Sequence, residues 1–344
     1  MARSGHLAVV TLSLAFLCIA SILSVSEAAL RASVTPVQRR SLVKNTWQNP
    51  QVYTQKCPGD GDWYSTKPKN FWSFFKSYCD PSHLPLNQWG NHSKMILDKS
   101  GIAGFGSYSA YFTGRFTMKI KLPPGNSSGT VFAFYLSSDG KKYKDHDEVD
   151  IEFLGNETGM PITMQTNIFV NGLGQREMRH NLWFDPSEAF HEYFIFWNSA
   201  MVLIGVDSIP IRVFMNNEQH GVPYLNKGQA LYCSHWDGSG WATQNGRIKI
   251  DYDLNAPFVA QVKGFGRSIN ACRVQSERNV WACKHPGPKP FCWERPEHLY
   301  LTDNQKNLLR WVAKDHCIYD YCKDDLRWVR ENMTKPLECD MLPY

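Results

Sequence analysis

A succession of short β-forming runs, separated by turn residues, constrains the fold of this chain more than any other feature. The runs occur between about residues 86 and 262. In the clearest of them Phe116, Met118 and Ile120 alternate with polar residues, which is the period of a strand with one buried face. Many short strands at this spacing predict an all-β sandwich. The most distinct runs are 111–122, 130–136, 189–198 and 201–214, the last with a turn at 207–210.

One later segment has the period of a helix instead. In residues 304–315 the side chains of Leu308, Leu309 and Val312 recur at helical spacing, and Trp311 widens the apolar stripe. We therefore expect one helix packed on the sandwich. The 344 residues, 43% of them hydrophobic, are enough for a large core.

Residues 144–156 place three carboxylates at every second position, with strongly apolar residues between them. In a strand, Glu148, Asp150 and Glu152 share one face and the apolar residues share the other. A buried core explains the apolar face. Folding alone does not explain three like charges in a row.

Paired carboxylates carry the chemistry of glycoside hydrolysis. A retaining enzyme needs two carboxyl groups about 5–5.5 Å apart, and an inverting pair needs about 6.5–9.5 Å. Glu148 and Glu152 have Cα atoms about 13 Å apart on a flat strand, so their side chains must lean together over Asp150. Crowded negative charge is expected to raise at least one glutamic acid pKa. The alternatives are a solvated edge strand or a calcium site.

The whole phrase His146–Asn156, HDEVDIEFLGN, closely resembles the active-site signature of the plant xyloglucan endotransglucosylase/hydrolases of glycoside hydrolase family 16. The likeness covers about residue 90 to the end. It implies a curved, concanavalin-like β-jelly-roll sandwich with an open substrate cleft and a disulfide-linked C-terminal extension. It also implies xyloglucan and related β-glucans as donor and acceptor, and we expect no cofactor, metal or nucleic acid. Further matching blocks are 97–107, 114–138, 164–198, 206–218, 240–258 and the tail at 318–339.

The resemblance also assigns roles position by position. Glu148 matches the nucleophile, Glu152 the acid/base and Asp150 the assisting carboxylate, with His146 beside them. Asn156 matches the family's glycosylation site. The positions that match substrate-binding residues are Gln165, Thr166, Asn167, Gln175, Arg176, Glu177, Gly240, Trp241 and Gly246, with Arg179 close by.

Cysteines and sequons indicate an oxidising, secretory environment. Nine cysteines remain if Cys18 is removed with a signal peptide, so at least one is free or pairs between chains. The resemblance implies the disulfides Cys272–Cys283 and Cys322–Cys339. One guess for the others is Cys57–Cys79 and Cys292–Cys317, with Cys233 free. Glycosylation sequons begin at Asn91, Asn126, Asn156 and Asn332.

The N-terminal residues 1–28 read as an export signal, with Arg3, an apolar run and a small-residue cleavage site at Ser26–Ala28. A signal anchor is the alternative. We expect a secreted, monomeric protein of the plant cell wall. The expected domains are an irregular extension at 29–85, the jelly-roll catalytic domain at 86–262 and the C-terminal extension at 263–344.

Several features bear on which reaction dominates. Only residues 170–175 separate Phe169 from Arg176, and family members that favour hydrolysis tend to carry an insertion here, so we expect a transferase. The phrase EVDIEFLG and Arg176–Met178 instead resemble the branch that contains the hydrolases. Ala313 and the 240–246 loop depart from the family on the acceptor side. A xyloglucan hydrolase, a transglucanase with other donors and a non-catalytic glucan-binding protein remain alternatives.

Overall fold

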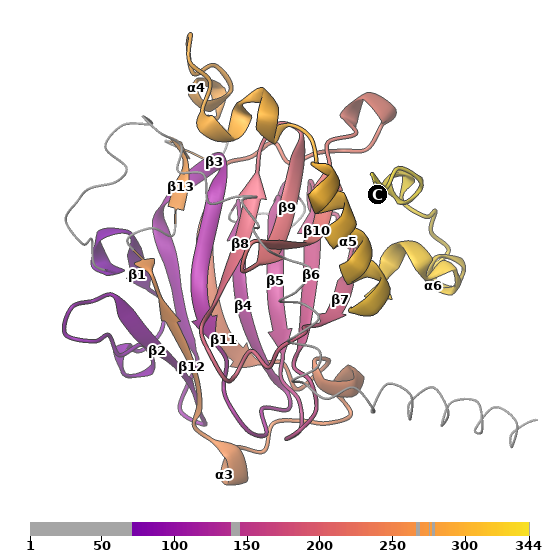
Figure 1. Cartoon of the computed structure of the whole chain (residues 1–344). Helices are drawn as coiled ribbons and strands as arrows, with labels where there is room; N and C mark the ends of the chain where they lie inside the picture. The colour runs from indigo at the N-terminus through magenta and orange to yellow at the C-terminus, as the bar shows by residue number, and fades with distance from the viewer. Residues whose placement is uncertain (1–70, 139–144, 266–268, 275, 277–278, 344) are drawn as a thin grey trace, which may run out of the picture. The chain divides into compact units, whose positions relative to one another are not determined.

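The computed structural model describes residues 71–138, 145–265, 269–274, 276 and 279–343. Within these residues 14 strands join in one continuous, antiparallel sheet, so the all-β expectation is confirmed (Figure 1). The strands are β1 (Phe75–Ser77), β2 (His92–Leu97), β3 (Ala103–Lys121), β4 (Thr130–Ser137), β5 (Glu148–Leu154), β6 (Thr163–Phe169), β7 (Met178–Asn181), β8 (His191–Trp197), β9 (Met201–Val206), β10 (Ile209–Met215), β11 (Gln229–Asp237), β12 (Phe258–Lys263), β13 (Ile269–Val274) and β14 (Cys317–Asp320).

The long strand β3 belongs to two layers. Its first half pairs with β11 and its second half pairs with β8. Between the halves the backbone turns at Thr113 (φ 51°) and Gly114 (φ 141°). A Cβ atom at Gly114 would lie 2.4 Å from the Cα atom of Ala271, so only glycine fits. A strand that bends and changes sheets is a standard way to close the corner of a sandwich.

The two layers face each other across a shared core. One layer has the order β10-β9-β8-β3 and the other the order β3-β11-β4-β5-β6-β7-β14. Between them the rings of Phe153 (β5) and Tyr193 (β8) lie 4.7 Å apart. Arg212 (β10) donates a hydrogen bond to the hydroxyl of Thr166 (β6) at 3.0 Å. The arrangement is the sandwich that the strand pattern predicts.

The predicted helix at 304–315 is also present, as α5 (Asp303–Asp315). Its N-terminus is closed by a capping box between Thr302 and Gln305, an arrangement that stabilises a helix by about 1 kcal/mol. Leu308, Leu309 and Val312 are buried, and α5 packs beside β10 (Figure 1). The other helical segments are α3 (Tyr252–Asn255), α4 (Trp281–Lys284), α6 (Asp325–Arg330) and short 3-10 turns at 71–73, 81–83, 218–220, 243–246, 292–294, 296–298, 321–323 and 337–340.

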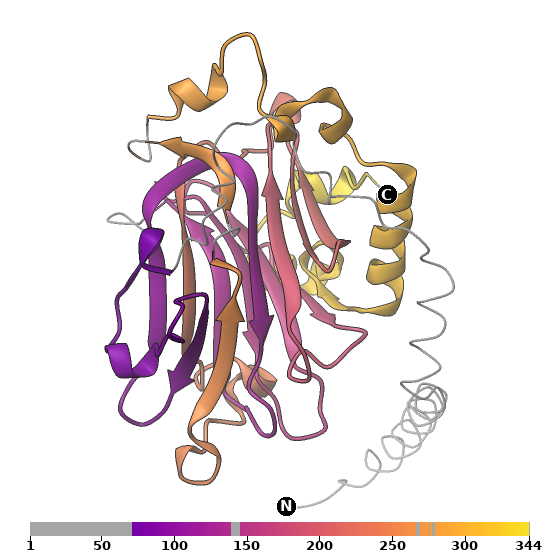
Figure 2. The same ribbon diagram turned by 60° about the vertical axis from the view of Figure 1, so that its left-hand side comes forward.

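The N-terminal boundary differs from the prediction. Phe71 and Phe75 are fully buried, and β1 pairs with β3. Phe75–Ser77 therefore belongs to the sheet, so the irregular extension does not run to residue 85. Figure 2 shows the N-terminal strands beside β12, with which β2 pairs along its whole length. The signal segment 1–28 and residues 29–70 lie outside the described residues.

The structure contains the disulfides Cys272–Cys283 and Cys322–Cys339, the two pairs that the resemblance implies. The guessed pairs Cys57–Cys79 and Cys292–Cys317 are wrong. Cys79 and Cys317 are free thiols, and Cys292 is itself disulfide-bonded. The Cys79 sulfur accepts a hydrogen bond from Gly104, and the Cys317 thiol donates one to Tyr319. Cys233 is free and buried, as that guess had it.

Among the described residues, no helix has both the length and the apolar character needed to cross a membrane.

Candidate active site

Strand β5 carries the three carboxylates on one face. Val149, Ile151 and Phe153 point into the core and are buried. Glu148 and Glu152 are only partly buried and lie on the opposite face, at either end of Asp150. The period-two pattern thus produces the expected amphipathic strand. We call the face with the carboxylates the cleft face.

Asp150 is the most buried of the three acids, with 8% of its surface exposed. Burial, followed by the charges of Glu148 and Glu152, holds the pKa of Asp150 well above its ordinary range. Asp150 is hydrogen-bonded to Glu148. A protonated Asp150 donates this bond, and it thereby fixes the carboxylate of Glu148 without adding a second negative charge.

Glu152 is held by a chain of polar contacts from the neighbouring strands. Gln165 on β6 donates its side-chain amide to the Glu152 carboxylate at 2.8 Å. The Gln165 carbonyl in turn accepts a hydrogen bond from Arg179 on β7 at 2.7 Å. Burial raises the pKa of Glu152, and the Gln165 hydrogen bond opposes this rise in part. A carboxyl group with a raised pKa and a fixed orientation suits a general acid.

Thr166 does not join this site. It lies opposite Ile151, on the core side of β6, and none of its surface is exposed. Its hydroxyl accepts a hydrogen bond from Arg212 of the other layer. Adjacent residues of a strand point to opposite faces, so Thr166 cannot share the cleft with Gln165 and Asn167. Its predicted role in substrate binding is therefore wrong.

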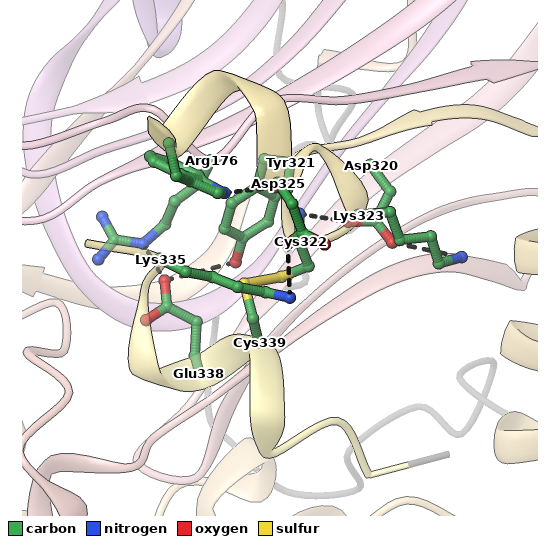
Figure 3. The surroundings of a disulfide bond; sticks show 10 residues. Arg176, Asp320, Tyr321, Cys322, Lys323, Asp325, Lys335, Glu338 and Cys339 are labelled. Carbon is green, nitrogen blue, oxygen red and sulfur yellow. Dashed lines mark hydrogen bonds and ion pairs between the residues drawn. A yellow bond between two sulfur atoms is a disulfide. The ribbon is translucent and has the colours of Figure 1, made fainter. Parts of the chain in front are cut away.

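Arg176 is a second correction of the same kind. Its side chain is 5% exposed and forms an ion pair with Glu338 at 2.5 Å. Gln175 and Glu177, on either side of it, are partly exposed, as is Arg179. The alternation assigns Gln175, Glu177 and Arg179 to the cleft and Arg176 to the interior. Arg176 is therefore buried on the side of the segment away from the carboxylates, where it pairs with Glu338 (Figure 3).

His146 and Asn167 lie beside the carboxylates. His146 places its Nε2 atom 3.9 Å from the nearer carboxylate oxygen of Glu148. Asn167 lies opposite Asp150, but its side-chain oxygen is occupied by the backbone amides of Ile168 and Arg176. Asn167 therefore shapes the cleft face and retains only its amide nitrogen for a ligand.

The predicted loop 240–246 lies near the end of β5. Trp241 is partly exposed and packs with Trp236 on a small cluster that includes Leu154, two residues beyond Glu152. Gly240 and Gly246 meet, because a Cβ atom at Gly246 would lie 2.3 Å from the Gly240 carbonyl oxygen. The indole of Trp241 therefore shares a cluster with Leu154 of β5, and its role in substrate binding stays a prediction. Asn156, also beyond β5, is partly exposed.

A row of tyrosines extends the cleft face away from β5. Directly opposed residues in antiparallel strands share a face. Tyr135 on β4 lies opposite Asp150, and Tyr232 on β11 lies opposite Tyr135, with the two rings stacked 5.2 Å apart. Tyr78 continues the row by covering Gly104 of β3, whose missing side chain leaves room for the ring. These tyrosines were not predicted from the sequence. Aromatic residues that share a face of neighbouring strands could have indicated them.

Two family models match most of the chain. The model of glycosyl hydrolases family 16 matches residues 75–254, and that of the xyloglucan endo-transglycosylase (XET) C-terminus matches residues 287–339. Xyloglucan endotransglucosylase protein 6 of Diospyros kaki is 44% identical over 256 residues, covering 73% of this chain and 82% of that protein. Xyloglucan endotransglucosylase/hydrolase protein 9 of Arabidopsis thaliana is 45% identical, with the same coverage.

The chain belongs to the xyloglucan endotransglucosylase/hydrolases of glycosyl hydrolase family 16.

Among solved structures, the apo Crh5 transglycosylase matches this family member with a TM-score of 0.47 and 25% identity, over 58% of this chain and 79% of that one. The family match begins at residue 75, at the first residue of β1, which agrees with the corrected N-terminal boundary.

The C-terminal extension of this xyloglucan endotransglucosylase/hydrolase takes part in the site. Its strand β14 pairs with β7 and widens the sheet. Arg327 on α6 donates hydrogen bonds to Glu177 at 2.7 Å and to the Tyr319 hydroxyl at 3.2 Å. Arg179 lies over the Tyr319 ring, 5.8 Å from its centre. Tyr319 and Arg327 were not predicted, because nothing in their local sequence indicates that a helix and a strand near the C-terminus reach the cleft.

Within the described residues, no group of three or more His, Cys, Asp or Glu side chains is arranged to hold a metal ion.

Proposed function

We propose that this protein is a retaining, endo-acting transglycosylase that cleaves the β-1,4-glucan backbone of xyloglucan and transfers the new end to another glucan chain. The observation that carries the proposal is the set of carboxylates on the cleft face of β5. Glu148 is hydrogen-bonded to the buried Asp150, whose pKa burial and the neighbouring carboxylates hold well above its ordinary range, and Glu152 has a raised pKa. These environments suit a nucleophile and a general acid respectively.

The reaction proceeds in two steps. In the first, Glu148 attacks the anomeric carbon while Glu152 protonates the leaving glycosidic oxygen, which gives a covalent glycosyl-enzyme. In the second, Glu152 removes the proton of an acceptor hydroxyl, which attacks the same carbon and releases Glu148. Gln165 and Arg179 hold Glu152 in place through both steps. If water replaces the acceptor hydroxyl, the outcome is hydrolysis.

Substrate contacts follow from the aromatic and polar groups around the carboxylates. Four aromatic side chains around the carboxylates have ring faces that suit pyranose rings. They are Tyr135, Tyr232, Trp241 and Tyr319. Gln175 and Glu177 offer hydrogen bonds to sugar hydroxyls. The proposed location is the plant cell wall, after export and with a glycan on Asn156, and the relatives from Diospyros kaki and Arabidopsis thaliana support a xyloglucan substrate.

A product assay tests the proposal. The secreted protein is incubated with xyloglucan and a labelled xyloglucan oligosaccharide, and label in polymer and new reducing ends are followed together. Labelled polymer with few reducing ends is the expected result. Reducing ends without labelled polymer would mean a hydrolase. If neither signal appears, other β-glucans are tested as donors.

The Glu148→Ala variant separates an enzyme from a glucan-binding protein. If Glu148 is the nucleophile, both products disappear while the variant still binds xyloglucan in a pull-down. A variant that retains full turnover would refute the assignment of Glu148. The Glu157→Ala variant, at an exposed position beyond β5, is the matched control and should behave as the unmodified protein.

A further inference from the structure

The loop that precedes β2, residues 87–92, is a turn closed by backbone hydrogen bonds. The Asn87 backbone amide donates a hydrogen bond to the His92 carbonyl at 2.9 Å, and the Gly90 amide donates one to the Asn87 carbonyl at 2.9 Å. Gly90 has φ 64°, a conformation that glycine adopts without strain. Two backbone hydrogen bonds and a glycine therefore define the conformation of this loop.

The side chain of Asn91 is held within the loop by Asn87. The Asn87 side-chain nitrogen donates to the Asn91 side-chain oxygen at 2.7 Å, and the Asn91 backbone amide donates to the Asn87 side-chain oxygen at 3.0 Å. Among the described residues, no hydrogen bond uses the side-chain nitrogen of Asn91. Because Asn91 is an exposed residue, this nitrogen is the atom that remains for a new bond.

Asn91, His92 and Ser93 form a glycosylation sequon. In the modification, the Asn91 side-chain nitrogen attacks the anomeric carbon of N-acetylglucosamine in a lipid-diphosphate-linked oligosaccharide. The bond from that carbon to the diphosphate breaks, the lipid diphosphate leaves, and one amide proton passes to a base of the transferase. The Asn91 oxygen is unchanged and can still accept the bond from Asn87. The contacts of the folded loop are therefore compatible with a glycan on Asn91.

Two tryptophans beside Asn91 are more exposed than is usual for this residue type. Trp89 is 69% exposed and Trp72 is 52% exposed. The Phe71 amide donates a hydrogen bond to the Gly90 carbonyl at 2.7 Å, which places Trp72 next to the loop. Within the part of the chain that the structure describes, the Trp89 indole forms no hydrogen bond and stacks on no other ring. The loop therefore carries an uncovered indole beside a free side-chain nitrogen.

The spacing in sequence brings a sugar on Asn91 within reach of Trp89. Only Gly90 separates the two residues, so their Cα atoms lie at most about 7 Å apart. The apolar C–H groups on one face of a pyranose ring can pack on the face of an indole. At the same spacing before the other three sequons stand the non-aromatic residues Pro124, Leu154 and Arg330. Asn91 is therefore the sequon with an aromatic surface for its first sugar.

We propose that Asn91 carries an N-linked glycan whose first sugar packs on the indole of Trp89. The inference goes beyond the proposed reaction and rests only on the export that is part of the proposed function. Contact between the sugar and the indole removes apolar surface from water in the folded protein, so the glycan stabilises the fold. It also covers part of an exposed aromatic patch that could otherwise bind other chains.

Mass spectrometry of glycopeptides from protein secreted by plant cells tests the modification. A glycan on the peptide that contains Asn91 is expected in most molecules, and the Asn91→Gln variant should lose the mass of one glycan. Secreted protein with an unmodified Asn91 would overturn the proposal and leave the proposed export intact. Protein that stays in the cells, with residues 1–28 attached and Asn91 unmodified, would overturn both.

Thermal unfolding tests the packing of the sugar on Trp89. Trp89→Ala is made in the unmodified protein and in Asn91→Gln. It should lower the melting temperature by about 2 °C more in the glycosylated background, since the contact exists only there. Any loss of the Asn87 hydrogen bond is common to both Asn91→Gln samples, so only the difference between the two effects counts.

Trp281→Ala is the matched control. Trp281 is 68% exposed, but it stacks on His285 and is not part of a sequon, so its effect should be the same in both backgrounds. Equal effects of Trp89→Ala in both backgrounds would overturn the packing of the sugar on this indole. If Trp89→Ala also weakened binding to xyloglucan in a pull-down, the indole would be a contact for the polymer instead.

Discussion

Gln165 and Thr166 are adjacent in sequence but do different work. Gln165 faces the cleft and orients Glu152, whereas Thr166 faces the core and accepts a hydrogen bond from Arg212. Gln165 therefore contributes to the proposed active site, and Thr166 contributes to the stability of the sandwich.

The Gln165→Ala variant is expected to lower kcat by about tenfold to a hundredfold, because a misoriented acid loses part of its catalytic effect. The Gln165 hydrogen bond lowers the pKa of Glu152, so its removal should also move the alkaline limb of the pH–rate profile upward. Steady-state kinetics across pH measures both effects. A profile that keeps its position would show that Gln165 does not contact Glu152 during the reaction.

The Thr166→Val variant is the complementary prediction. It keeps the shape of the side chain and removes a buried acceptor of Arg212, so the free energy of unfolding should fall by about 1–3 kcal/mol. The kcat and KM values of the folded enzyme should not change. Denaturant unfolding and kinetics on the same preparation check this. A selective rise in KM would return Thr166 to the substrate-binding residues.

At the scale of elements, β14 and α6 bring the C-terminal extension to the edge of the cleft. Arg327 connects them by its bonds to Glu177 and Tyr319. The C-terminal extension therefore adds residues to the cleft face.

The Arg327→Ala variant is expected to raise the acceptor KM several-fold while donor cleavage persists, because Glu177 and Tyr319 lose their common partner. Assays at varied acceptor concentration and fixed donor concentration separate the acceptor KM from the rate of donor cleavage. Arg330→Ala on the same helix is the control, since its side chain is 74% exposed. Equal effects from both substitutions would mean that the helix is merely destabilised.

Elements with a clear period could be predicted from the sequence, and elements that depend on distant partners could not. The alternation in β5 and the apolar stripe of α5 are local signals, and both were predicted correctly. The three-residue strand β1 has no period of its own and is a strand only because β3 pairs with it. Arg176 was misassigned because its motif resembles a binding segment, while its burial depends on Glu338, far along the chain.

At the scale of the whole molecule, two buried histidines couple stability to pH. Burial lowers the pKa of His180 to about 3 and that of His235 to about 4. Below about pH 6.5 the unfolded chain binds protons at these positions and the folded chain does not. Stability is therefore lost as the pH falls from 6.5 toward 4, at up to about 1.4 kcal/mol per pH unit for each histidine.

In the His180→Phe variant the free energy of unfolding should fall less steeply as the pH decreases. The change in slope should correspond to up to one bound proton per molecule. Denaturant unfolding at pH 7, 6 and 5 measures the slope, and His220→Phe, at an exposed position, is the control. An unchanged slope in His180→Phe would show that His180 is protonated in the folded protein.

Strand β3 also determines when the sheet can be completed during synthesis. It pairs with β1, β8, β11, β12 and β13, and the last three of these follow it by more than a hundred residues. On the ribosome β3 emerges early, while most of its partners are still untranslated. The edges of β3 therefore stay unpaired until those partners are translated. Unpaired strand edges fold slowly and promote aggregation. The nascent chain is thus exposed to aggregation until β13 is complete, and a fragment that ends earlier retains an unpaired edge.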